Sequence, residues 1–167
     1  TGDRKREAVT SANRFLRAAR KRTVITKRFK ESFFPYRGEE IKVFFEQLKT
    51  RVAPDLIFTH YRDDLHQDHR VISELTWNTF RNHLILEYEI PKYDGDLGQP
   101  NVYVPLAQVV ARTKVNYLME GFSTQRSRQW FTEDTFYSLL RLRGIESNAS
   151  EKYAESFFGR KIILAGE

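Results

Sequence analysis

The sequence predicts an α/β protein built on a mostly parallel sheet. Between about residues 3 and 90, helix-like spacing alternates with short apolar runs in the order helix, strand, helix, strand, helix, strand. Such alternation is typical of parallel α/β sheets. The run at residues 56–59 lies between a proline and a charged cluster, as expected of a buried central strand. Because the chain opens on a helix, we expect the first βα unit of such a sheet to be lacking.

Apolar residues at helical spacing predict the first two helices. A helix over residues 3–20 has an apolar stripe and a basic opposite face, and a short strand is expected at 23–26. The next helix, about 39–50, carries its own apolar stripe. The two stripes consist of Ala8, Ala12, Phe15, Leu16 and Ala19, and of Ile41, Phe44, Phe45 and Leu48.

The remaining elements follow the same reasoning. A helix is expected to end near residue 81, and the apolar run at 84–90 predicts the next strand. Residues 91–100 are rich in turn formers and follow that strand, so we expect a loop beside the same edge of the sheet. Two helices, about 105–121 and 132–144, and a last strand at 161–164 complete the prediction.

Composition favours one globular domain over residues 1–167. The chain is 40% hydrophobic and 14% aromatic, and its apolar runs are shorter than the roughly 18 residues that cross a bilayer. Neither a signal peptide nor a membrane span is predicted, so we expect a cytoplasmic protein. With no cysteine, any metal must be held by histidine and carboxylate. Two aromatic pairs, Phe33-Phe34 and Trp130-Phe131, are either core or interface, which leaves the oligomeric state open.

The net charge of +6 is concentrated at the N-terminus. Residues 1–30 hold eleven Lys and Arg against two acids, a net +9 that leaves −3 for the remainder. This could be an electrostatic footprint for nucleic acid, but no nucleic-acid motif accompanies it. We therefore expect a solvated helix face and no nucleic-acid partner.

Residues 60–70 hold three of the four histidines and three aspartates, between a predicted strand and a predicted helix. In open α/β sheets ligands bind where strands end, so this crowding predicts a metal or acid/base site. If Asp68 caps the helix, His69 lies in its first turn, where the helix dipole favours the neutral imidazole that a metal requires. One alternative is a surface helix cap; another is a self-contained metal site in which Asp63 or Asp64 joins His66 and His69.

The segment from Pro54 through His60 to His66-Gln67-Asp68-His69-Arg70 resembles the second signature of the PIG-L/LmbE-like zinc-dependent N-deacetylases. The resemblance extends more loosely to most of the chain. It implies a Rossmann-like three-layer α/β fold with helices on both faces of a mostly parallel sheet. It also implies a zinc-dependent hydrolase that removes the N-acetyl group of an N-acetylglucosamine-type sugar or glycoconjugate.

The resemblance implies a role for each matching residue. His69 corresponds to a zinc ligand, and His66 to the histidine that acts as general acid or stabilises the oxyanion. Asp68 corresponds to the aspartate that orients this histidine. We expect Arg62 and Lys92 as candidate contacts to substrate hydroxyls or a phosphate.

Two departures from the family pattern matter. The family's first signature, a His-Pro-Asp-Asp type motif that supplies two zinc ligands and the general base, is not among these 167 residues. Asp64 stands where some relatives have a tyrosine that assists the oxyanion. We therefore expect the C-terminal portion of a deacetylase domain, inactive by itself. The alternative is a non-catalytic binding module that keeps the fold.

Overall fold

The computed structural model describes residues 2–163. Its elements, in chain order, are α1 (Gly2–Phe15), η1 (Phe34–Arg37), α2 (Gly38–Lys49), β1 (Leu56–His60), α3 (Gln67–Thr79), β2 (Leu84–Tyr88), β3 (Val102–Leu106), α4 (Gln108–Gly121), η2 (Ser123–Gln125), α5 (Glu133–Glu146) and β4 (Tyr153–Phe158).

The chain divides into two compact units. Unit 1 comprises Thr1–Arg28 with Val104–Glu155, and unit 2 comprises Phe29–Tyr103 with Ser156–Glu167. The strands form one four-stranded sheet in the order β1-β2-β4-β3, and the unit boundary falls within β3 and β4. A single domain over residues 1–167 stays a prediction.

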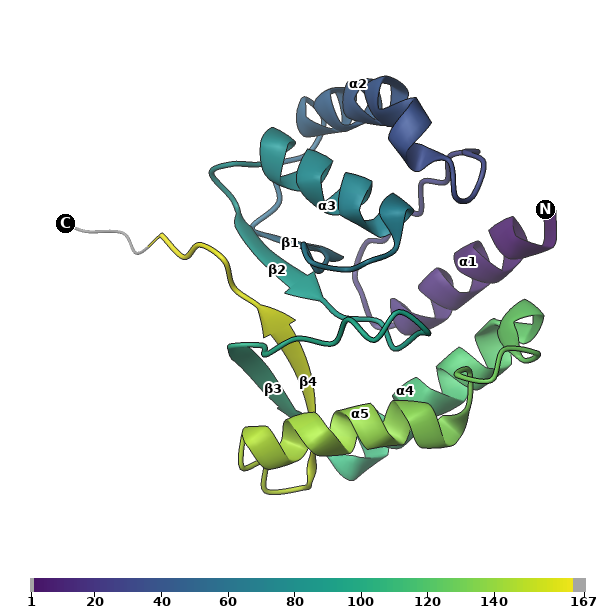
Figure 1. Cartoon of the computed structure of the whole chain (residues 1–167), viewed down its shortest axis with the longest axis vertical. Helices are drawn as coiled ribbons and strands as arrows, with labels where there is room; N and C mark the ends of the chain where they lie inside the picture. The colour runs from purple at the N-terminus through teal and green to yellow at the C-terminus, as the bar shows by residue number, and fades with distance from the viewer. Residues whose placement is uncertain (1, 164–167) are drawn as a thin grey trace. The chain divides into compact units, whose positions relative to one another are not determined.

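Unit 2 is built on a parallel pair of strands. β1 and β2 pair from Leu56 with Leu84 to His60 with Tyr88, and α3 packs on β1 and on α2 (Figure 1). Ile85 of β2 is fully buried, and Ile41 of α2 nearly so. The predicted apolar stripe of α2 therefore faces the interior of this unit.

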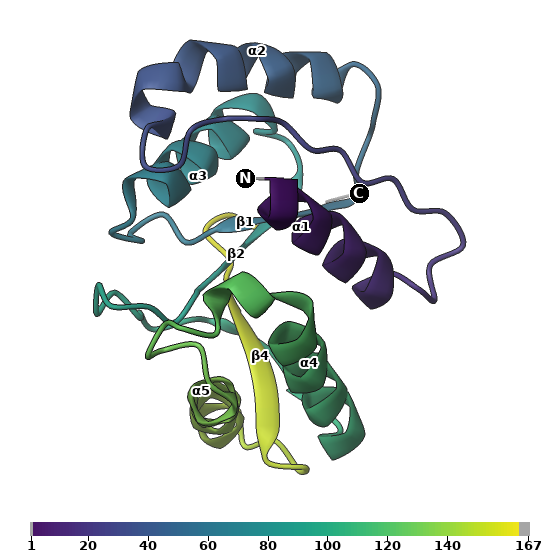
Figure 2. The same cartoon turned by 90° about the vertical axis from the view of Figure 1, so that its right-hand side faces the viewer.

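Unit 1 is built on three helices. α1 packs on α4, and α4 packs on α5; Figure 2 shows α4 and α5 lying beside β4. The core of this unit consists of Ala111, Val115, Phe131, Phe136 and Leu140. Gly144 of α5 lies against the backbone of Lys152, where an added Cβ would come within 2.0 Å of the carbonyl oxygen. Only glycine allows α5 and the start of β4 to approach so closely.

The α/β prediction is confirmed, with a mixed sheet. β2 and β4 are antiparallel through Glu87 with Phe158 and Tyr88 with Phe157. The predicted helices all form, with bounds shifted by up to five residues. Among residues 2–163, no helix has the length and apolar character needed to cross a bilayer.

Two strand predictions were wrong, and two strands were not predicted. Residues 23–26 form no strand, and residues 161–163 lie outside regular structure, while Leu164 lies outside the described residues. The last strand is instead β4, whose burial alternates between buried Ala154 and Ser156 and their half-buried neighbours. β3 occupies residues 102–106, of which 102–104 had no predicted element and 105–106 were expected to begin a helix. Its exposed Val104 and Pro105 gave no strand pattern.

Candidate active site

The predicted cluster lies where β1 and β2 both end. Because the strands are parallel and His60 pairs with Tyr88, the loops that follow them leave the same edge of the sheet. The Asp96 carboxylate accepts a hydrogen bond from the Leu65 backbone N–H at 2.7 Å. The turn-rich loop 91–100 therefore lies against the cluster, as the sequence predicted.

His66 and Asp68 begin helix α3 in a different way from the one expected. The N-cap is His66, whose Nδ1 accepts from the Asp68 N–H at 3.3 Å. The buried Asp68 carboxylate instead accepts from the backbone N–H groups of Ser32 (2.7 Å) and Phe34 (3.1 Å). The prediction that Asp68 caps the helix was therefore wrong, because its oxygens accept from two backbone N–H groups of a preceding turn.

Asp64 lies at the centre of the cluster. Its Oδ1 accepts from the His66 N–H at 2.8 Å, and its Oδ2 lies 2.8 Å from His69 Nδ1. The Lys92 ammonium is 3.1 Å from the same Oδ2 and also pairs with Asp96. The Lys92 side chain is only 9% exposed, so it bridges two carboxylates inside the cluster rather than standing in solvent.

Burial and charge shift the acidity of three groups here. Burial alone would raise the pKa of the Asp64 carboxyl, but hydrogen bonds from His69 and the His66 backbone lower it to about 2. The pKa of His60 is lowered to about 3, mainly by burial and to a smaller extent by the charge of His69. The pKa of Tyr88 is raised to about 12, mainly by burial and to a smaller extent by the charge of Asp64. At neutral pH the site thus contains a carboxylate at Asp64, a neutral His60 and a protonated Tyr88.

Three side chains of the cluster offer metal-ligand atoms. Atoms of His60, Asp64 and His69 lie within 4.8 Å of one another, and imidazole with carboxylate is a donor set that zinc binds. The rings of His60 and His69, however, are stacked 4.0 Å apart at an interplanar angle of 5°. A metal takes the imidazole lone pair in the ring plane about 2.0–2.1 Å away, so two stacked parallel rings do not both point at one ion. The arrangement fits a metal on Nε2 of His69, with Asp64 on its Nδ1.

Arg62 contributes its backbone to a neighbouring network. Its guanidinium is exposed and lies 3.5 Å from Asp63, while its N–H donates to the fully buried Glu87 at 2.9 Å. Glu87 also accepts from Trp77 Nε1 and from the Arg160 guanidinium. This network around Glu87 was not predicted from the sequence. Its signal is an acid inside an apolar strand, which requires buried partners.

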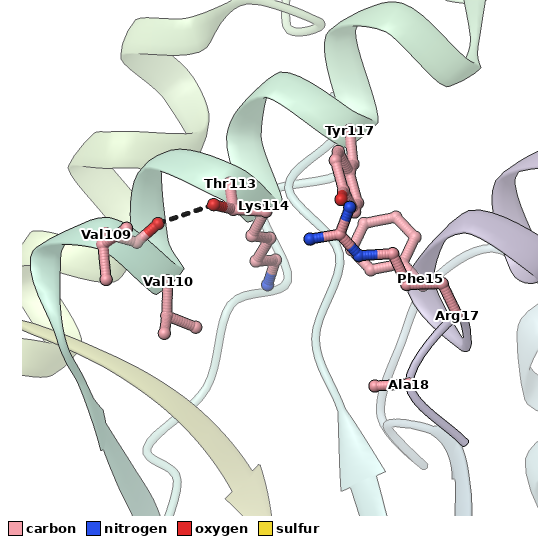
Figure 3. Close-up of a pocket in the computed structure, with 8 residues that line it drawn as sticks. All are labelled: Phe15, Arg17, Ala18, Val109, Val110, Thr113, Lys114 and Tyr117. Carbon is pink, nitrogen blue, oxygen red and sulfur yellow. Dashed lines mark hydrogen bonds between the residues drawn. The ribbon is translucent and has the colours of Figure 1, made fainter. Parts of the chain in front are cut away.

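A separate hollow lies in unit 1. It has a volume of about 330 Å³ and lies between the end of α1 and the first turns of α4 (Figure 3). Phe15, Val109 and Val110 give it an apolar lining, and the Arg17 guanidinium lies 5.7 Å from the centre of the Tyr117 ring. Its lining includes none of the predicted site residues.

A known protein family matches the part of the chain that contains His66, Asp68 and His69. The model of the PIG-L family, described as GlcNAc-PI de-N-acetylase, matches residues 1–80. Over these residues the chain is PIG-L-like. The match covers β1, His66, Asp68 and His69, and confirms the family resemblance predicted from the sequence; Lys92 lies beyond it. Among curated proteins, none matches the chain significantly.

Solved structures share the fold. The conserved protein TT1542 from Thermus thermophilus has a TM-score of 0.66 at 16% identity, over 99% of this chain and 76% of its own. The A40926 pseudoaglycone deacetylase Dbv21 has a TM-score of 0.55 at 18% identity, over 78% of this chain and 58% of its own. The zinc-inhibited form of teicoplanin deacetylase Orf2 has a TM-score of 0.57 at 13% identity, over 83% of this chain and 57% of its own. At these identities the likeness establishes the α/β fold alone, and the chain aligns with just over half the length of the two deacetylases.

Proposed function

We propose that the protein is a zinc-dependent de-N-acetylase that hydrolyses the acetamide of an N-acetylglucosamine-type sugar conjugate. The observation that carries the proposal is the convergence of His66 and His69 at the end of β1. Each ring has its Nδ1 engaged, by the Asp68 N–H and by Asp64 respectively, so each presents its Nε2. The PIG-L match over residues 1–80 and the fold shared with two deacetylases support the same reaction class.

His69 is the proposed metal ligand, through Nε2. A zinc ion bound there would polarise the acetyl carbonyl and acidify a bound water. The proposal concerns the whole protein, because the family's first signature, the expected source of the other ligands and the general base, is not among these residues.

His66 is the proposed catalytic acid. Because its Nδ1 accepts a hydrogen bond, the neutral ring carries its proton on Nε2. From there it would donate a hydrogen bond to the carbonyl oxygen as negative charge develops. To protonate the amine as the C–N bond breaks, the ring would have to act as an imidazolium, with Nδ1 also protonated. Such proton transfer typically contributes about 10²- to 10⁴-fold in rate.

The other predicted residues take supporting roles in this proposal. Asp68 positions His66 through its backbone N–H, while its carboxylate fixes residues 32–34. The Lys92 ammonium has three N–H donors, and Asp64 and Asp96 can each accept one. Lys92 is proposed to donate the third to substrate hydroxyls or a phosphate. Arg62 is proposed to do the same at the exposed rim.

The test is release of free amine from N-acetylglucosaminyl conjugates. We expect His66→Ala to lower turnover by about 10²- to 10⁴-fold. The matched control is His83→Ala, because His83 packs on Phe80 in the turn before β2. Amine release that survives His66→Ala unchanged contradicts the proposed role. Saturable sugar binding without amine release would instead support the second candidate, a binding module, in which Lys92 serves only to neutralise Asp64.

A further inference from the structure

Asp64 differs from the neighbouring acid Asp63 in burial and in its contacts. The Asp64 side chain is 2% exposed, whereas that of Asp63 is 64% exposed and lies near Arg62. Both Asp64 oxygens are used: one accepts from the His66 N–H, and the other faces His69 Nδ1 at 2.8 Å. Such a carboxylate is placed to control an imidazole rather than to meet solvent.

We infer that Asp64 is a positioning residue: it accepts the Nδ1–H of His69 and holds that ring in the tautomer whose Nε2 lone pair is free. An imidazole tautomer is set by the hydrogen bond that its other nitrogen makes. The consequence for metal binding rests on the proposed function, whereas the tautomer itself does not.

Lys92 and Asp96 keep Asp64 an acceptor. The Lys92 ammonium bridges the two carboxylates, and Asp96 also accepts from the Leu65 N–H at 2.7 Å. An ammonium only donates hydrogen bonds, so Asp64 Oδ2 acts as an acceptor at this contact. The loop after β2 therefore holds in place both the Asp64 side chain and the loop that carries it.

His60 limits the rotation of the same ring. It stacks on His69 with a centroid distance of 4.0 Å, so the ring held by Asp64 at one edge is covered on one face. The His69 side chain is nonetheless 23% exposed, which leaves part of it open to a ligand. These contacts together define a single ring orientation.

The test is the position of the ring proton of His69, read from the ¹⁵N signals of its two ring nitrogens. The chain has four histidines, so four single His→Gln substitutions assign every ring. At about pH 9, well above the ordinary imidazole pKa of about 6.5, we expect the proton on Nδ1 in the wild-type protein. A wild-type spectrum with the proton on Nε2 overturns the inference, whatever any variant does.

Asp64→Asn is the informative variant, and Asp63→Asn is its matched control. An amide has one acceptor oxygen, and while the His66 N–H keeps that oxygen, the NH₂ group faces His69 Nδ1 as a donor. We therefore expect the His69 proton to move to Nε2 in Asp64→Asn and to stay on Nδ1 in Asp63→Asn. Backbone amide spectra report whether each variant is folded. A folded Asp64→Asn protein that keeps the proton on Nδ1 contradicts the inference.

Zinc affinity separates this inference from the proposed function. Loss of a ligand's hydrogen-bond partner typically weakens metal binding about 10- to 100-fold, and we expect that loss for Asp64→Asn but not for Asp63→Asn. A protein that releases no amine, yet shows the expected tautomer and its reversal, overturns the deacetylase proposal and leaves the positioning role intact. An active protein in which His69 carries its proton on Nε2 supports the deacetylase proposal and overturns the positioning role.

Discussion

At the scale of single residues, Asp68 is a buried carboxylate that ties a distant turn to helix α3. It accepts from the N–H groups of Ser32 and Phe34, and Ser32 has the left-handed φ of 69° that such a turn requires of it. Both bonds go to a charged group that is itself buried. Such bonds contribute more to stability than bonds between neutral groups.

We predict that Asp68→Ala lowers the free energy of unfolding by roughly 3 kcal/mol, since each bond to a charged group is worth roughly 1.5–3 kcal/mol. Denaturant unfolding measures the loss, and limited proteolysis should show new cleavage near residues 29–34. Asp68→Asn keeps one acceptor oxygen and should lose about half as much. Asp63→Ala, in an exposed position, serves as the control. Equal stability of Asp68→Ala and Asp63→Ala would refute this role.

The residue types of the site were predictable from the sequence, but the pairing within it was not. The crowding of His and Asp after an apolar run identified His66, His69 and their neighbours. Nothing in the spacing distinguished Asp64 from Asp63, because the difference is that Asp64 turns inward to Lys92, 28 positions along the chain. Tertiary contacts of that kind leave no local pattern.

At the scale of elements, an acid on α1 joins that helix to η2 within unit 1. Glu7 accepts from Ser123 Oγ (2.7 Å), Thr124 N (2.9 Å) and Thr124 Oγ1 (2.6 Å). These bonds, first from the Thr124 hydroxyl and then from Ser123, lower the pKa of Glu7 below its ordinary value of 4.5. Because the folded-state pKa is the lower one, this contribution to stability is present above the ordinary pKa and is lost as pH falls below it.

We predict that Glu7→Gln flattens the acid limb of the stability profile. Unfolding free energies measured between about pH 6 and pH 3 should decline less steeply in Glu7→Gln than in the wild-type protein, since one titrating group is removed. Asp55→Asn, an exposed acid outside any helix, is the control and should change the slope less than Glu7→Gln does. Identical slopes in Glu7→Gln and the wild type would show that these bonds do not couple α1 to η2.

Element types were predictable where periodicity was strong. The helices from α1 to α5 and the strands β1 and β2 follow their apolar patterns. β3 and β4 were not predicted because short, half-exposed strands have too few buried side chains to give a recognisable pattern. The last strand was instead assigned to the apolar residues near 162–163.

At the scale of the whole molecule, the candidate site is built from one continuous stretch, residues 60–96, within unit 2. The contacts among these residues therefore do not depend on the placement of unit 1. The PIG-L match ends at residue 80, before Lys92 and Asp96, so the loop that braces Asp64 lies outside the matched residues. In the proposed function, metal binding by this stretch depends on His69.

The central claim is that His69 binds the catalytic metal, and zinc content tests it most directly. The protein would be expressed with any residues that precede Thr1 in its natural reading frame, dialysed, and analysed for zinc beside His69→Ala and His83→Ala. We predict about one zinc per chain in the wild type and in His83→Ala, and almost none in His69→Ala. Equal zinc in His69→Ala and the wild type, or no zinc in any of the three, would contradict it.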